Sequence, residues 1–244
     1  MAGETNARFT WYGHSVIQVD TPGGKRILID PWLGNPRSPI TADQVELPDV
    51  LLVTHGHDDH MGDALQIASR ARPKWPCMHE MSLWLGRRLP GGSDAVIGMN
   101  KGGTVELEGI RITMVAADHS AGDWNASAES TLYLGEPAGF VVELEDGSRF
   151  YHAGDTAVFG DMRLIAELHR PELAFLPIGG HFTMDPAAAA LAVELLRVPR
   201  VVPIHYGTFP LLAGTPDGLR EALQTRGQPD VEVVAPEPGE TFEW

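Results

Sequence analysis

A dense group of potential metal ligands directly after an apolar run constrains the fold of this chain more than any other feature. Residues 50–53 read Val-Leu-Leu-Val, which is typical of a buried strand. The ligand candidates that follow are His55, His57, Asp59 and His60, and a helical pattern begins near residue 62. Imidazole and carboxylate groups suit zinc and similar ions. A histidine-rich surface loop, the other interpretation, would crowd groups that repel when protonated. We therefore predict a strand that ends in a metal-binding loop.

Three more candidate ligands lie far downstream, each after a strand-like segment. They are His119, Asp155 and His205. Together with the first group, they resemble the His-x-His-x-Asp-His signature and the distant ligands of the metallo-β-lactamase-fold hydrolases. Residues 11–15, Trp-Tyr-Gly-His-Ser, also resemble a subgroup of metal-dependent hydrolases related to L-ascorbate-6-phosphate lactonase.

The resemblance implies a centre of two divalent metal ions. One ion would be held by His55, His57 and His119, the other by Asp59, His60 and His205, with Asp155 as the bridge. Zinc suits these ligands best on general grounds, although the same set also accepts manganese, nickel or iron. By the same resemblance, a hydroxide that bridges the two ions is the nucleophile of a hydrolysis, and Asp59 orients it.

The resemblance also implies an α/β fold, a four-layer αββα sandwich in which residues 1–244 form a single domain. Strand patterns at residues 8–20 and 25–30 agree with this, because they form an opening meander before strand and helix patterns alternate. Helices are predicted near residues 63–72, 82–88, 162–169, 186–197 and 217–225. The fourth follows Asp185, a good N-cap residue. Residues 121–137 lack periodicity, so we expect an irregular segment in the pocket wall.

Loops beside the ligand segments contain further candidates. His181 and Thr183 lie in a glycine-rich loop after the strand pattern at residues 173–178. This loop either forms a plain tight turn or supplies proton transfer and substrate contacts, and we favour His181 as a catalytic residue. Arg37 lies in the proline-rich segment 31–39 and is the one cation we can suggest for contact with a phosphorylated substrate.

Polar residues near the strand ends are candidates for supporting the centre. Asp30 ends a strand close to the ligand loop and is placed to hydrogen-bond a ligand histidine. His14, in the opening motif, either faces the metal centre or is a buried histidine bonded to the backbone. His152 either supports the centre or packs in the core.

The function that these residues favour is hydrolysis of an ester, lactone or related acyl bond in a small molecule. Phosphodiester hydrolysis is the alternative enzyme activity, because the same pair of ions stabilises phosphoryl transition states. Outside the enzymes, the alternative is a metal-binding regulatory module without turnover.

The composition limits the partners. A formal net charge of −15 argues against a nucleic-acid partner, because binding to a phosphate backbone needs clustered Lys and Arg. No apolar run approaches the roughly 18 residues of a membrane span, and no signal-like segment opens the sequence, so we expect a cytoplasmic protein without a membrane partner. Both a monomer and a homo-oligomer are compatible with the sequence. Cys77, the single cysteine, is expected in the core.

Overall fold

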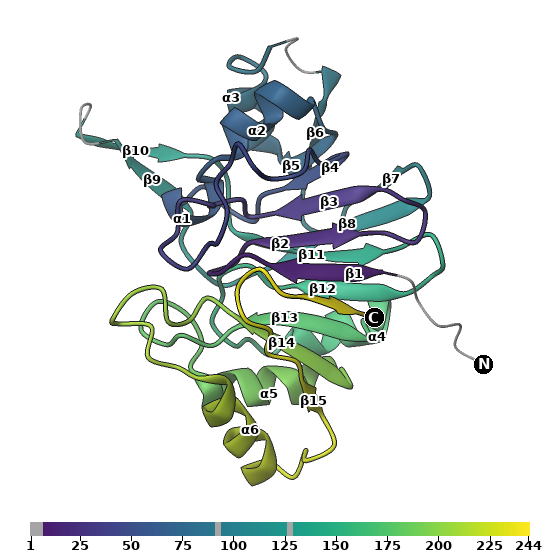
Figure 1. The fold of residues 1–244 in the computed structure, drawn as a ribbon, viewed down its shortest axis with the longest axis vertical. Helices are drawn as coiled ribbons and strands as arrows, with labels where there is room; N and C mark the ends of the chain where they lie inside the picture. Colours follow the sequence, from purple (N-terminus) through teal and green to yellow (C-terminus); the bar gives the residue numbers. More distant parts are fainter. Residues whose placement is uncertain (1–6, 91–93, 126–128) are drawn as a thin grey trace.

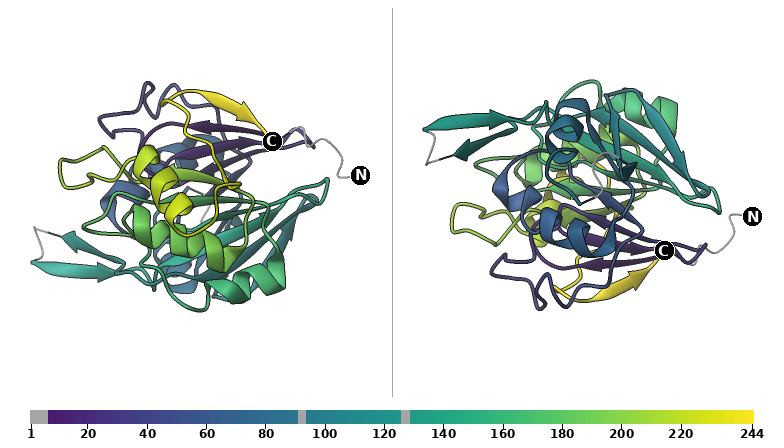
Figure 2. Two further views of the ribbon diagram at one scale, coloured as in Figure 1. Left: turned by 90° about the horizontal axis from the view of Figure 1, so that it is seen from below. Right: turned by 90° about the horizontal axis from the view of Figure 1, so that it is seen from above.

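Two β-sheets packed face to face form the centre of the computed structural model, which describes residues 7–90, 94–125 and 129–244 (Figures 1 and 2). The first sheet has the strand order β16-β1-β2-β3-β4. Its strands are β1 (Arg8–Trp11), β2 (Ile17–Asp20), β3 (Arg26–Ile29), β4 (Val50–Leu52) and β16 (Thr241–Glu243). Strands β1 to β3 form the predicted antiparallel meander, and β4 pairs parallel to β3.

The second sheet has seven strands in the order β15-β14-β13-β12-β11-β8-β7. They are β7 (Thr104–Leu107), β8 (Ile110–Ala116), β11 (Ala138–Glu143), β12 (Arg149–His152), β13 (Leu173–Pro177), β14 (Arg200–Ile204) and β15 (Glu232–Val233). Strands β8 and β12 are both antiparallel to β11, and β12, β13 and β14 are parallel. The strands β8, β12, β13 and β14 therefore all end at the same edge of this sheet.

Aromatic side chains join the two sheets. The ring of Phe9 in β1 lies 5.3 Å from that of Phe150 in β12 and 5.4 Å from that of Phe175 in β13, measured between centroids. All three side chains are fully buried. Burial of each contributes about 1.5–3 kcal/mol to folding, so this cluster fixes the two halves of the chain against one another. Cys77 is buried as well, as expected from the sequence.

Six helices and two small strand pairs complete the described fold. The helices are α1 (Asp58–Met61), α2 (Ala64–Ala71), α3 (His79–Leu85), α4 (Met162–His169), α5 (Pro186–Leu196) and α6 (Pro216–Thr225). Helices α2 and α3 lie with the parallel pair β5 (Trp75–Met78) and β6 (Val96–Met99) beside the first sheet, and α4 to α6 lie beside the second (Figure 1). The arrangement is the predicted four-layer αββα sandwich. Asp185 caps α5 by accepting a hydrogen bond from Ala188 N (2.8 Å). None of the helices in the described ranges is long and apolar enough to cross a membrane.

The structure differs from the sequence prediction in several local elements. Residues 58–61, expected in a loop, form α1, because Asp58 and Asp59 suit a helix N-terminus. The sequence did not reveal this helix, since four residues are too few to show helical periodicity. The segment expected to be irregular contains the antiparallel strands β9 (Gly122–Asn125) and β10 (Ser130–Tyr133), which project from the body (Figure 1). Residues 126–128 of that segment lie outside the described residues. The sequence pattern also predicts neither β6 nor β16, which are short.

A close approach between two loops near β14 requires glycine at position 214. Gly214 N donates a hydrogen bond to Gly179 O (3.2 Å), and a Cβ at position 214 would lie 1.8 Å from the carbonyl oxygen of Ile178. We expect Gly214→Ala to lower the free energy of unfolding by about 1–3 kcal/mol, because the backbone must move apart. Urea unfolding measures this change.

The matched control is Gly160→Ala, whose new Cβ would have nothing within 4 Å. Its free energy of unfolding is expected to change by less than about 0.5 kcal/mol, as for most surface substitutions. Equal stability of the two variants would show that the two loops tolerate a side chain.

Candidate metal centre

The candidate ligands come together because their strands end at one edge of the sandwich. His55 and His57 follow β4, and α1 carries the next two ligands of the same segment. His119, Asp155 and His205 follow β8, β12 and β14, whose ends share an edge of the second sheet. Loops after strand ends are the usual place for functional groups in α/β proteins, because the sheet fixes where each loop begins.

Asp155 lies in the middle of the cluster. One oxygen, Oδ1, is 3.2 Å from His60 Nε2, and the other, Oδ2, is 3.1 Å from His205 Nε2 and 3.6 Å from His119 Nε2. His55 Nε2 and His57 Nδ1 lie 2.9 Å apart, and both residues form a group of potential ligands with His119. The structure thus brings together the seven candidate ligands expected from the sequence.

The spacing of the donor atoms fits metal ions. Three groups of side chains each have their potential ligand atoms within 4.8 Å of one another. They are His55, His57 and His119; His55, His60 and Asp155; and His14, Asp59, His60 and His205. The third group includes His14, which the sequence did not predict as a ligand.

Several buried polar atoms of the cluster make no hydrogen bond of good geometry, and the nearest polar atoms to three of them belong to the cluster itself. The buried atoms are His60 Nε2, Asp155 Oδ1 and both ring nitrogens of His205. Buried polar atoms without partners are rare in folded proteins, because each costs about 1–3 kcal/mol. Nitrogen and carboxylate lone pairs directed into a shared space are what a bound cation satisfies, so these residues fit a metal centre.

Asp30 holds one ligand histidine in place. Its side chain is fully buried, and Oδ1 accepts a hydrogen bond from Thr54 N while Oδ2 accepts one from Thr54 Oγ1, both at 2.8 Å. His60 Nδ1 lies 2.8 Å from the same Oδ2, which leaves its Nε2 directed at the cluster. Burial opposes protonation of His60, but the carboxylates of Asp155 and Asp30 raise its pKa well above the ordinary value. The contact expected of Asp30 is therefore present.

His14 faces the cluster, which decides between the two interpretations of this residue. The ring is fully buried, with Nε2 3.2 Å from Asp59 Oδ2 and Nδ1 3.0 Å from Thr208 Oγ1. Burial lowers the pKa of His14 to about 4, although the hydrogen bond to Asp59 favours the protonated ring. A neutral ring donates from Nε2 to Asp59 and accepts the Thr208 hydroxyl at Nδ1. Burial alone would raise the pKa of Asp59, but the hydrogen bond from His14 and the charge of His60 lower it.

Other sequence candidates lie apart from the cluster. His181 is exposed, has φ of 56°, and packs its ring edge-to-face on Phe182, with 4.4 Å between centroids. Thr183 is half-buried and its hydroxyl has no hydrogen-bond partner. Neither residue lines the cavity at the cluster.

Arg37 and His152 have other partners. Arg37 Nη1 donates a hydrogen bond to Tyr206 O (3.2 Å), and its guanidinium lies over the rings of Trp11 and Tyr206. His152 is fully buried, stacks on Phe175 and accepts a hydrogen bond from Gly154 N (3.2 Å). The structure therefore gives neither residue a contact with the cluster, and His152 packs in the core.

A cavity of about 430 Å³ opens onto the cluster. Its lining residues are His57, Asp59, His119, Ser120, Asp155, Phe182, His205 and Phe209. Sequence reasoning missed Ser120, Phe182 and Phe209. The first two directly follow candidate residues in the chain, and Phe209 lies in the loop after the last ligand, so nearness in sequence is the signal that could have identified them.

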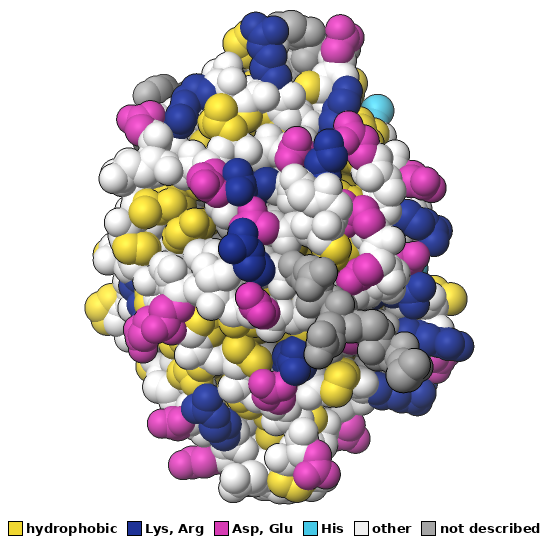
Figure 3. All heavy atoms as spheres, turned by 45° about the vertical axis from the view of Figure 1, so that its right-hand side comes forward, with side chains coloured by type: hydrophobic (Ala, Val, Ile, Leu, Met, Phe, Trp, Pro, Cys, Tyr) yellow, Lys and Arg dark blue, Asp and Glu magenta, His cyan; other side chains and the backbone are white. Residues whose placement is uncertain are grey.

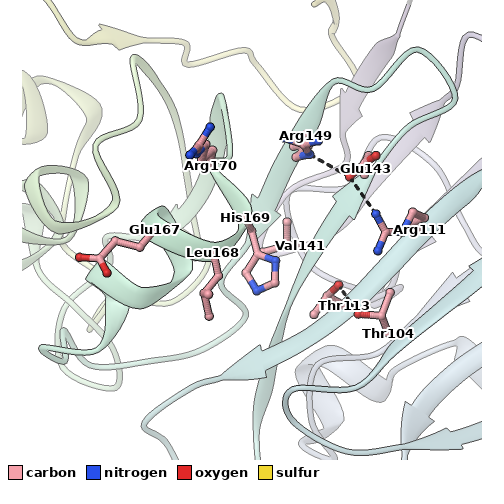
Figure 4. Close-up of a pocket in the computed structure, with 10 residues that line it drawn as sticks. All are labelled: Thr104, Arg111, Thr113, Val141, Glu143, Arg149, Glu167, Leu168, His169 and Arg170. Carbon is pink, nitrogen blue, oxygen red and sulfur yellow. Dashed lines mark hydrogen bonds and ion pairs between the residues drawn. The ribbon is translucent and has the colours of Figure 1, made fainter.

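A second cavity, of about 460 Å³, lies on the outer face of the second sheet beside the end of α4 (Figure 4). Glu143 in its wall accepts a hydrogen bond from Arg149 Nε (2.8 Å) and lies 3.6 Å from Arg111 Nη1. These contacts neutralise much of the positive charge that the arginines bring. None of its lining residues belongs to the metal-binding groups.

An αββα sandwich with a His/Asp cluster at one edge defines the class as the metallo-β-lactamase fold. The family model described as the beta-lactamase superfamily domain matches residues 25–206, and the chain belongs to this superfamily. A UPF0173 metal-dependent hydrolase of Koribacter versatilis is 46% identical over 236 residues, which are 96% of this chain and 97% of the relative. A UPF0173 metal-dependent hydrolase of Archaeoglobus fulgidus is 45% identical over 238 residues, which are 97% and 99% of the two chains.

Solved structures agree with this assignment. The metallo hydrolase Igni18 from Ignicoccus hospitalis superposes with a TM-score of 0.85 at 38% identity, over 98% of this chain and 99% of that one. An isothiocyanate hydrolase from Delia radicum gut bacteria superposes with a TM-score of 0.73 at 22% identity, over 97% and 99% of the two chains. At 22% identity, the similarity to the isothiocyanate hydrolase shows a shared fold alone.

Proposed function

We propose that the chain is a metal-dependent hydrolase that cleaves an ester, lactone or related acyl bond in a small molecule. The central position of Asp155 is the observation that carries this proposal. Its two carboxylate oxygens lie between His60, His119 and His205, which is the arrangement that a pair of neighbouring cations would share. Similarity to metal-dependent hydrolases over nearly the whole chain supports the same activity.

The residues that would hold the metal ions form two sets joined by Asp155. One set is His55, His57 and His119, and the other is Asp59, His60 and His205, which lie in one group with His14. Bound there, a pair of divalent ions would supply a nucleophile from water at neutral pH and polarise the bond to be cleaved. Zinc is the first choice for such ligands, and manganese, nickel and iron are the alternatives.

The side chains around the cluster keep these ligands in fixed orientations. His14 donates from Nε2 to Asp59 Oδ2, which leaves Asp59 Oδ1 to act as a ligand or to accept a proton from water. Because the pKa of Asp59 lies below its ordinary value, this carboxylate is ionised at neutral pH. Asp30 fixes His60 through Nδ1 in the same manner.

Acyl-bond hydrolysis is favoured over phosphodiester hydrolysis by the charges at the cavity. A phosphorylated substrate is usually held by Arg or Lys, and no such residue is among those that line the cavity. Arg37, the suggested cation, uses its guanidinium on Tyr206 and Trp11. The relationship to a lactonase stays a prediction.

The partner we propose is a small molecule rather than a nucleic acid. On the face drawn in Figure 3, acidic and basic side chains are interspersed. Ion pairs such as Arg26 with Asp20 (2.8 Å) and Arg200 with Glu232 (2.6 Å) reduce the free positive charge further. A strongly acidic chain of this kind offers little attraction to a phosphate backbone.

The Asp59→Asn variant tests the proposed activity. Wild-type protein loaded separately with zinc, manganese and nickel is expected to hydrolyse aryl esters or lactones, and the variant is expected to lose about a hundredfold or more in kcat. Steady-state kinetics with an aryl ester, a lactone and a phosphodiester measure this. Circular dichroism checks that the variant keeps its fold.

The control is Asp43→Asn, since this side chain is 79% exposed and lies outside the cavity. It is expected to keep wild-type turnover. Undiminished hydrolysis by Asp59→Asn, or by wild-type protein after chelation, would rule out the proposed mechanism. Metal binding without turnover on any bond class would favour the regulatory module.

A further inference from the structure

We infer that the centre takes uncharged substrates with an aromatic or bulky aliphatic group beside the bond that is cleaved, and that Phe182 and Phe209 bind this group. The inference rests on the proposed function and names the substrate class for the same site. It starts from the cavity wall, in which only Ser120, Phe182 and Phe209 are not part of the metal-binding groups. The group next to the reacting bond therefore meets two phenyl rings.

Both rings are more exposed than large apolar side chains usually are. Phe182 is 52% exposed and Phe209 is 38% exposed, although they stand next to charged groups. An exposed apolar surface beside convergent polar groups is the usual composition of a small-molecule site. Covering these rings with an apolar ligand would release water from them, which favours binding.

Each ring is supported from behind. Phe209 stacks on Trp32, with 5.8 Å between centroids and 28° between planes, and meets the edge of His14 at 5.9 Å. Phe182 lies in a tight turn that begins at Gly180, whose φ is 75°. The backbone amide of Phe182 donates a hydrogen bond to Gly180 O (2.6 Å). His181 packs on the side of Phe182. Rings held in this way offer a preformed surface, so little side-chain entropy is lost on binding.

The side chains of the same wall offer an anionic group of the substrate no cation. The charged lining groups outside the histidines are the carboxylates Asp59 and Asp155, and none of the lining residues is Lys or Arg. A carboxylate or phosphate on the substrate, away from the bond that is cleaved, would therefore find no cationic side chain, and only the metal ions could pair with it. Ser120, whose hydroxyl lies 3.4 Å from His57 Nε2, is the lining group that can hydrogen-bond a neutral acyl or leaving-group oxygen. The volume of about 430 Å³ holds a small aromatic ester.

The first experiment measures kcat/KM of the metal-loaded enzyme for two esters matched in shape. p-Nitrophenyl butyrate is neutral, and p-nitrophenyl hemisuccinate replaces its terminal methyl group by a carboxylate. The butyrate is expected to be preferred by at least about tenfold, and Phe182→Ala and Phe209→Ala are each expected to lower kcat/KM for the butyrate by about tenfold. Both variants should change turnover of ethyl acetate, which has neither an aromatic nor a bulky aliphatic group beside the cleaved bond, much less.

Leu168→Ala is the control substitution, because Leu168 is 74% exposed and lines the second cavity instead. It is expected to leave all three esters unaffected. An equal or greater kcat/KM for the hemisuccinate, or unchanged butyrate turnover in both Phe variants, would overturn the inference.

The second experiment needs neither metal nor turnover. Saturation-transfer NMR with phenylacetamide and phenylacetate, matched in shape, is recorded on the metal-free protein. The neutral amide is expected to give the stronger signal, and this signal is expected to fall in Phe182→Ala and Phe209→Ala but not in Leu168→Ala. Equal signals in all variants would overturn the inference. Binding that depends on the two rings, in a protein without metal-dependent turnover, would refute the proposed activity and leave the aromatic site in place.

Discussion

Asp155→Asn is expected to abolish the stabilisation that added zinc gives the wild-type protein. Asp155 is almost fully buried and approaches His60, His119 and His205, so an amide in its place removes the negative charge that both sets of ligands share. Zinc at a hundred times its dissociation constant stabilises a folded protein by about 2.7 kcal/mol. A loss of affinity of more than about a hundredfold would remove most of this gain.

Thermal unfolding with and without zinc, together with metal analysis after dialysis, measures the effect. Asp43→Asn is the matched control, since its exposed side chain lies away from the cluster, and it should keep the full rise in Tm. If Asp155→Asn bound the same number of zinc ions with the same affinity as wild type, Asp155 could not be the shared ligand.

Asp30→Ala is expected to have the largest effect on folding stability among the single substitutions considered. It would leave Thr54 N, Thr54 Oγ1 and His60 Nδ1 without their common acceptor in a fully buried position. Removing one partner from a buried charged pair typically costs about 3–5 kcal/mol. Urea unfolding of the metal-free protein measures the change in the free energy of unfolding.

Asp30→Asn keeps an oxygen acceptor and is expected to lose less stability than Asp30→Ala. Asp43→Ala removes an exposed carboxylate and is expected to change the free energy by less than about 1 kcal/mol. A loss in Asp30→Ala no larger than that in Asp43→Ala would mean that the buried network contributes little to the fold.

The candidate ligands could be named from the sequence because they resemble a known signature and because each ligand segment follows a strand whose pattern is local. The apolar run before His55 and the alternation before His119 fix where a loop begins, and strands that end at one edge bring such loops together. The contacts of Asp30 could be anticipated for the same reason.

Other parts of the site depend on contacts that no local pattern encodes. Phe182 and Phe209 belong to loops whose conformation is set by tight turns and by packing on Trp32, so their place in the cavity wall is not visible in the sequence. Arg37 is the opposite case. Its proline-rich segment predicts a side chain at the mouth of the site, but the side chain instead contacts Tyr206 and Trp11. His14 needed the fold to place it beside Asp59.

The pairing of β16 with β1 has a consequence for how the chain is made. Thr10 Oγ1 and Thr241 Oγ1 lie 2.7 Å apart although 231 residues separate them along the chain. At a synthesis rate of about 5–20 residues per second, β1 would emerge on the order of 10–50 s before its edge partner exists. During that interval the nascent chain carries an open strand edge, which is prone to pair with other chains. Completion of the first sheet is therefore a late event, and cellular folding factors that shield this edge would matter most before β16 arrives.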